Sequence, residues 1–168
     1  MADLISGRLE VDDDFEAVQA LYLESGWTDG LPIKPPTLGR VEAMLASTPL
    51  SPQDIIGEIP PNWGSATVEK LAVNAMMAGC RPEYLPVIIA AVEAMCDEVF
   101  NLYAIQATTH PCAPLIIVNG PICEELGLHG GSGAFGPGWQ PNATIGRAVR
   151  LVQLNVGGAH PGVGDMST

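Results

Sequence analysis

The chain has 168 residues, the size of one ordinary domain, because single hydrophobic cores usually fall between about 100 and 200 residues. Seven Lys and Arg against 19 Asp and Glu give a net charge of −12, so we expect nucleic-acid backbones and anionic membrane surfaces to repel the protein. No apolar run approaches the roughly 18 residues of a membrane span. These figures exclude nucleic-acid binding and favour a soluble protein.

In chain order, the first predicted element is an N-terminal helix within residues 1–26. Asp12 to Asp14 supply an N-cap and a favourable charge at the helix start, and Gly26 suits its end. Three prolines and a glycine make residues 27–37 a Pro-rich ordered loop. A helix over 38–46 and a strand over 54–59 follow. Further helices are predicted over 67–79 and 81–97, and the second of these is apolar on nearly all sides, so we expect it to be central and buried.

The C-terminal half is predicted to begin with two strands, 102–109 and 113–119, the second buried on both faces. A Gly-rich loop over 127–141 leads into a helix over 142–155, and the tail 159–168 lacks a core-forming pattern. We therefore expect one domain over 1–168 of the α/β class, with mixed α+β as the alternative. It would have a small central sheet of about three to four strands packed by about five helices.

Four segments of this sequence resemble uncharacterised bacterial proteins associated with the UGSC-motif (seleno)protein family. The matching residues include Asp29-Gly-Leu-Pro, Asn74-Ala-Met-Met-Ala-Gly-Cys-Arg-Pro-Glu-Tyr84, Thr108-Thr-His-Pro and Asn142-Ala-Thr-Ile-Gly-Arg147. Together the matches cover most of residues 27 to 165. The U-G-S-C tetrad itself is absent, so the resemblance implies no redox role and no particular reaction. Members of the group look longer, and the chain is therefore expected to correspond to their N-terminal part.

Three residues are candidates for catalysis. His110 lies between a predicted strand end and a proline, where α/β sheets place reactive side chains, and an imidazole exchanges protons near its ordinary pKa of about 6.5. Cys80 lies at a predicted helix start, where main-chain amides and Arg81 favour a thiolate. Asp29 lies on the proline-stiffened loop. The alternatives stay open: a turn histidine, a packing cysteine and a turn aspartate.

A second group of residues is expected to hold a small anionic substrate. The Gly-rich loop carries Gly131 and Gly133 and leads into a helix, so its N–H groups are available to an anion. Arg147 on that helix either reaches a carboxylate of the substrate or pairs with an acidic residue. Glu58, Glu69 and Asn74 are further side chains that could face the same crevice. The remaining members of the predicted binding set are Lys34, Asn119, Asn142 and Thr144.

Cofactor signals are sparse. Gly131-Ser-Gly-Ala-Phe-Gly136 matches the letters of a dinucleotide-binding loop, but no strand directly precedes it and Pro137, Gly138 and Pro141 delay the helix, so no dinucleotide is expected. The cofactor stays unknown. His110 and Cys112 are the available metal ligands, without a third at a zinc spacing, so a metal site stays open.

The cysteine pattern and the low charge complete the sequence analysis. Four cysteines without a CxxC pair or a signal peptide indicate reduced thiols in the cytoplasm. Only 15% of residues are charged and 47% are hydrophobic, which favours a homo-oligomer or a partner subunit. The main hypothesis is a cytoplasmic enzyme that uses His/Cys acid–base or nucleophilic chemistry on a small anionic molecule, and it requires His110, Cys80 and Arg147 to line one cavity. The alternatives are a non-catalytic or incomplete subunit that docks on a partner polypeptide and a small-molecule binding module.

Overall fold

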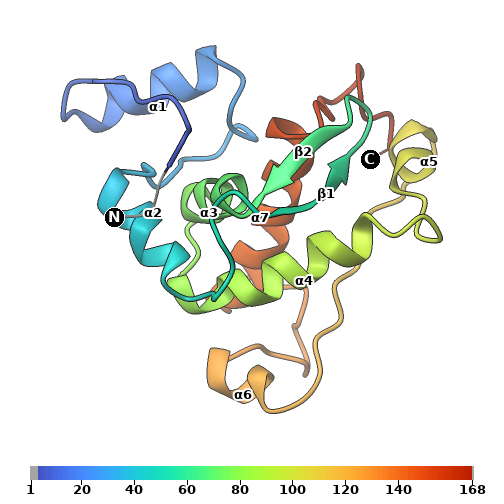
Figure 1. Ribbon diagram of the computed structural model, residues 1–168. Coiled ribbons are helices and arrows are strands. Elements are labelled where there is room, and N and C mark those ends of the chain that lie inside the picture. Colours follow the sequence, from blue (N-terminus) through green and yellow to red (C-terminus); the bar gives the residue numbers. More distant parts are fainter. Residues whose placement is uncertain (1–3, 168) are drawn as a thin grey trace.

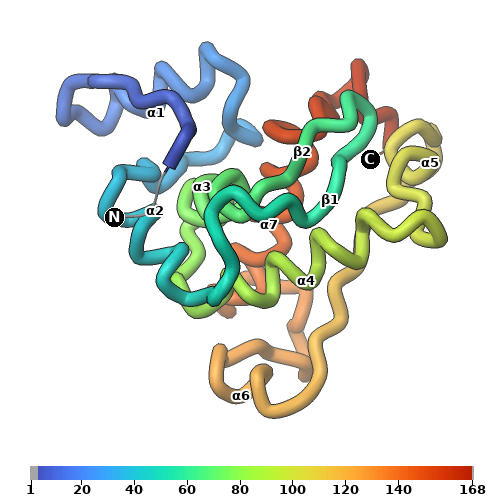
Figure 2. Tube along the Cα trace, in the orientation of Figure 1, coloured from blue at the N-terminus to red at the C-terminus, as the bar shows by residue number. Residues whose placement is uncertain are grey.

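The computed structural model describes residues 4–167 (Figures 1 and 2). Over this range the chain forms seven α-helices, one short 3-10 helix (Pro82–Tyr84) and a two-stranded antiparallel sheet. The fold is therefore mixed α/β and consistent with α+β, and its sheet is smaller than the predicted one. Between residues 4 and 167, no helix is long and apolar enough to cross a membrane.

The centre of the fold is the packing of α3 (Val68–Met77) against α7 (Gln140–Asn155), with α4 (Leu85–Met95) beneath them (Figure 1). The predicted apolar stripe of α3 is buried throughout, and the Thr67 side chain caps the helix by accepting a hydrogen bond from the Lys70 N–H. The predicted apolar positions of α7 are also buried: Ile145, Val149 and Val152.

The N-terminal elements confirm the capping signals. Helix α1 (Phe15–Glu24) begins after Asp14, whose carboxylate accepts a hydrogen bond from Ala17 N at 2.9 Å. Helix α2 (Leu38–Leu45) buries Val41, Met44 and Leu45, as its spacing predicts. The Pro-rich loop between them is ordered because the buried Gln19 amide bonds both the N–H and the C=O of Ile33, at 3.0 and 3.2 Å.

The sheet is a hairpin of β1 (Ile55–Ile59) and β2 (Gly64–Thr67). Strand β1 was predicted, whereas β2 has no alternation of apolar residues and was not. Helix α4 was expected to be buried on nearly all sides, which is wrong. It buries one face, which includes Leu85, Ile88 and Val92, while Pro86 and Ala90 are exposed.

The two strands predicted over 102–119 are wrong. Residues Leu102–Ala107 form helix α5, because the Asn101 side chain caps its first turn by accepting a hydrogen bond from Ala104 N at 3.4 Å. Residues 113–119 belong to no described strand and are not buried on both faces: Leu115 is 63% and Ile117 is 74% exposed. A short helix that was not predicted, α6 (Ile122–Leu126), follows this segment.

The C-terminal tail folds back onto α7, which contradicts its description as open. The Arg150 guanidinium pairs with the buried Asp165 carboxylate at 2.5 Å and also donates to the Ala159 carbonyl at 3.0 Å. Met166 N donates to the Gln106 carbonyl at 2.8 Å, which ties the tail to α5 as well. Ordered packing is thus achieved by polar contacts rather than by an apolar pattern.

We predict that Gly157→Ala strongly destabilises the fold. A Cβ at this position would overlap the Pro60 and Gln153 carbonyl oxygens, which belong to main chain that cannot move aside cheaply. The expected loss of unfolding free energy is about 3 kcal/mol, measured by urea denaturation. The matched control is Gly146→Ala on α7, where a Cβ meets nothing within 4 Å, and it should be neutral or stabilising by up to about 1 kcal/mol. Equal stability of the two variants would contradict the prediction.

Candidate ligand-binding cleft

Two predicted site residues, Asp29 and Arg147, meet in the structure and pair with each other. Arg147 donates to both Asp29 carboxylate oxygens, at 2.9 and 2.8 Å, and to the Leu31 carbonyl at 3.2 Å. Partial burial opposes ionisation of Asp29, but the hydrogen bonds and charge of Arg147 outweigh it, so the pKa of this carboxyl lies below its ordinary value. The pair clamps the Pro-rich loop onto α7, so neither charge is free for a substrate or a proton.

The Cys80 thiol is beneath the surface. Its side chain is fully buried, and its Sγ donates to the Thr144 carbonyl at 3.2 Å. Burial is the largest effect on this group and raises the pKa of the Cys80 thiol to about 11, although Thr144 and the Arg147 charge act in the opposite direction. The thiol is therefore protonated near neutral pH, which does not suit a nucleophile.

His110 lies on the connection that follows α5 and is exposed. Its main-chain N–H donates to the Thr108 hydroxyl at 3.2 Å, and its C=O accepts from Cys112 N at 2.8 Å. His110 is not among the described residues that line the two cavities of the molecule. The structure therefore does not place His110, Cys80 and Arg147 around one cavity. Within residues 4–167, no group of three His, Cys, Asp or Glu is arranged to hold a metal ion.

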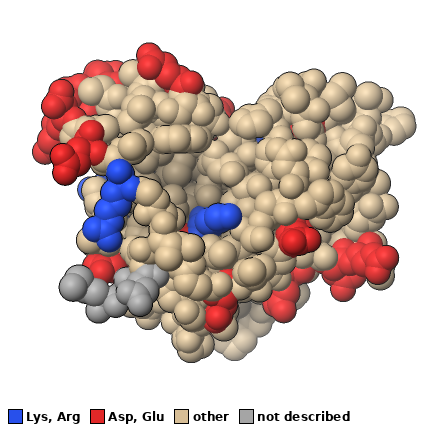
Figure 3. Space-filling view, turned by 45° about the horizontal axis from the view of Figure 1, so that its top comes forward, with Lys and Arg blue, Asp and Glu red and all other residues tan. Residues whose placement is uncertain are grey.

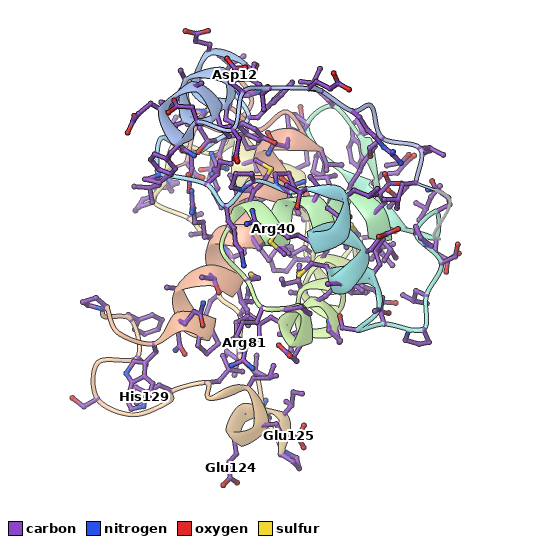
Figure 4. The ribbon with its side chains drawn as sticks, turned by 90° about the vertical axis from the view of Figure 1, so that its left-hand side faces the viewer. Asp12, Arg40, Arg81, Glu124, Glu125 and His129 are labelled. Atoms are coloured by element: carbon purple, nitrogen blue, oxygen red, sulfur yellow. The ribbon has the colours of Figure 1, made fainter. Side chains whose placement is uncertain are left out.

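The Gly-rich loop is held by its own contacts. Asn142 accepts from His129 N at 3.0 Å and donates to the carbonyls of His129 and Ala134, so its amide is fully used. The His129 ring stacks on Trp139 with centroids 4.2 Å apart, and Figure 4 shows it within the lobe that projects from the body together with α6. A Cβ on Gly131 would lie 3.1 Å from the His129 ring.

The other predicted binding residues are distributed over separate parts of the structure. Gly133, in the Gly-rich loop, has a φ of +82°. The Thr144 hydroxyl donates within α7 to the Gln140 carbonyl at 2.9 Å. Lys34 and Asn119 are exposed, on the Pro-rich loop and before α6 respectively. The structure does not bring these residues into one anion site.

The largest cavity lies elsewhere, between the N-terminal segment, α1, α2 and α3. This main cleft has a volume of about 800 Å³, and Figure 3 shows the surface hollowed beside the lobe built on α1. Most of its lining is apolar, and acidic side chains gather on the outside of the α1 lobe. Its apolar walls include Leu9, Val18, Tyr22, Trp27, Val41, Val73 and Met77.

An asparagine pair forms part of the main cleft where α3 meets the end of α7. Asn155 Nδ2 donates to the Asn74 side-chain oxygen at 2.7 Å and to the Trp27 carbonyl at 2.9 Å, and Asn74 donates to the Lys70 carbonyl at 2.9 Å. The Asn155 Oδ1 atom is buried without a hydrogen-bond partner among the described residues. Such an oxygen costs about 1–3 kcal/mol, an amount that a donor brought by a ligand could recover.

Charged groups border the same cleft. The Glu69 carboxylate accepts from Ile5 N, Ser6 N and the Gln53 amide at 3.1, 2.9 and 2.8 Å, and so holds the N-terminal segment in place as one wall. Burial opposes ionisation of Glu69, but these hydrogen bonds outweigh it and lower its pKa. Arg8 and Lys70 also line the cleft.

Sequence reasoning considered Glu69 and Asn74 but missed Arg8, Trp27 and Asn155. Asn155 lies at the end of the predicted α7 helix, so its position was known, but its contact with Asn74, 81 residues away, was not. Comparisons with protein families, with curated proteins and with solved structures find no match for this chain. The resemblance to UGSC-associated proteins therefore stays an expectation.

We predict that Asp29→Asn lowers the unfolding free energy by about 1–3 kcal/mol at pH 7, because the charged hydrogen bonds to Arg147 are lost. A carboxyl with a lowered folded pKa stabilises the fold above its unfolded pKa, and this contribution is lost as pH falls through the folded pKa. The difference from wild type should therefore vanish in acid, as denaturation at several pH values would show. Asp12→Asn, at an exposed position, is the control and should match wild type throughout. A deficit that persists at low pH would contradict the prediction.

Proposed function

We propose that the protein binds a small anionic molecule with an apolar body in the main cleft. The observation that carries this proposal is a cavity of about 800 Å³ with mostly apolar walls and basic side chains among its lining residues. Ligand sites typically occupy about 300–1,000 Å³, with apolar walls and a few polar groups that fix orientation. The proposal develops the small-molecule binding alternative and keeps the anionic ligand class.

The charge of the lining supports an anionic ligand. Arg8 and Lys70 line the main cleft, in a chain with seven Lys and Arg in total. Arg8 makes no hydrogen bond or ion pair with the described residues, whereas the Lys70 ammonium donates to the Ser65 carbonyl at 2.8 Å. Glu69 does not cancel this preference, because its oxygens already accept three hydrogen bonds. A carboxylate is the simplest group to interact with Arg8 while an apolar chain lies along the cleft.

The contacts favour binding over turnover. Catalysis by His110 and Cys80 stays a hypothesis, but the thiol is buried and bonded to Thr144, and His110 lies outside the main cleft. Within this cleft the Asn74–Asn155 pair supplies hydrogen-bonding groups rather than an acid or a base. Amides of this kind orient a bound molecule and do not exchange its protons.

The test uses decanoate, which has an apolar chain and one carboxylate, and calorimetric titration of the full chain. Decanoate should bind wild type, and decanol, which lacks the charge, should bind more weakly. Val73→Phe fills the cleft from α3 and should weaken binding about tenfold or more. Arg8→Gln should weaken decanoate binding about two- to fivefold and leave decanol binding unchanged.

Two matched controls belong to this experiment. Arg81→Gln removes an equally exposed cation that pairs with Glu83 at 3.3 Å and is not part of the cleft lining. Val99→Phe adds the same bulk at a position that is 93% exposed. Both should bind decanoate like wild type. Absence of decanoate binding, or equal weakening in Arg8→Gln and Arg81→Gln, would refute the proposal.

A further inference from the structure

The segment 113–119 has the side-chain pattern of a β-strand but no strand beside it among the described residues. Exposed and half-buried residues alternate along it, which is the period of an extended strand with one face on the body. Ile116, on the inner face, packs against the hydrophobic core, while Leu115 and Ile117 point their 63% and 74% exposed side chains outward. Figures 1 and 2 show this part of the chain running without coils between α5 and α6.

One edge of this segment offers complete main-chain hydrogen-bonding groups. In residues 115–119, no N–H donates to a carbonyl of the described chain. Alternate residues of a strand point their N–H and C=O groups to the same edge, so Leu115 and Ile117 share one edge. The opposite edge contains Pro114, which has no N–H, and Val118, whose C=O accepts from Cys123 Sγ at 3.2 Å. The Leu115 edge is therefore the one able to pair with another strand.

The distribution of charge identifies a second copy of the chain as the occupant of this edge. The protein carries a net charge of −12, yet residues 99–123 contain no Asp, Glu, Lys or Arg. Glu124 and Glu125 follow on α6, at the far end of the projecting lobe in Figure 4. Two copies with the same strong charge repel least where each presents an uncharged surface. A partner of opposite charge would find nothing to pair with there, whereas an apolar strand is complementary to itself about a two-fold axis.

We propose that two copies of the chain form a dimer by antiparallel pairing of residues 113–119. The two-fold axis passes at Ile116, so that Leu115 lies opposite Ile117 of the second copy and these residues exchange their N–H and C=O groups. The pairing converts two isolated strands into a two-stranded ribbon and covers the outward apolar side chains of both copies. The proposal is independent of the main cleft, which these residues do not line.

Sedimentation equilibrium of the full chain tests the dimer. Wild type should show a mass twice that of one chain over a concentration series. Ile117→Glu brings two carboxylates to diagonal positions about 7–8 Å apart across the axis and should weaken the dimer about tenfold or more. Val99→Glu adds the same charge at another exposed apolar position and should dimerise like wild type.

The register has its own test. Leu115→Lys combined with Ile117→Glu places opposite charges directly across the axis and should restore dimerisation relative to Ile117→Glu alone. In hydrogen exchange, the amides of Leu115 and Ile117 should be protected more strongly as the protein concentration rises. A monomeric wild type, a dimer unaffected by Ile117→Glu, or equal weakening in Val99→Glu would overturn the proposal. Failure of the double variant to recover would overturn the register, and circular dichroism of each variant verifies that it folds.

Discussion

The packing of α3 against α7 is the contact on which the rest of the structure depends. Both helices bury an apolar face there, and the other parts of the chain attach to them through individual polar contacts. Arg147 holds the Pro-rich loop through Asp29, and Arg150 holds the tail through Asp165. The Asn74–Asn155 hydrogen bond joins the same two helices beside the main cleft. A rigid helix pair thus fixes both the position of the loops and the polar part of the candidate site.

Local signals made the helical part of the fold predictable. Asp14 and Thr67 cap α1 and α3 where the sequence places them, and the apolar spacing of α2 and α7 matches their buried faces. The region 102–119 was predicted wrongly for two different reasons. The Asn101 cap decides for a helix over a segment whose composition favours a strand, which is a local effect. The β-branched run Ile116–Val118 correctly indicates extended backbone, but pattern alone does not show whether the chain supplies a neighbouring strand.

The candidate site was less predictable because it depends on contacts between distant residues. Asp29 and Arg147 are 118 residues apart, and the sequence left open whether Arg147 binds a substrate or an acidic side chain. The structure shows the acidic partner. Cys80 looked activated because it lies near a helix start and Arg81, but activation also requires solvent, and the neighbouring helices bury it completely. The main cleft draws its walls from five separate parts of the chain, and no short motif encodes such an arrangement.

The way Glu69 holds the N-terminal segment has a consequence for how large a molecule the protein admits. One wall of the main cleft is fastened by main-chain hydrogen bonds from Ile5 and Ser6 to a single carboxylate, whereas the opposite walls are helices embedded in the core. Detaching that wall costs about as much as a few hydrogen bonds, and the core stays intact when it happens. The entrance therefore has a hinged side and a fixed side, and bulky molecules enter by displacing the strip of chain that begins at Leu4.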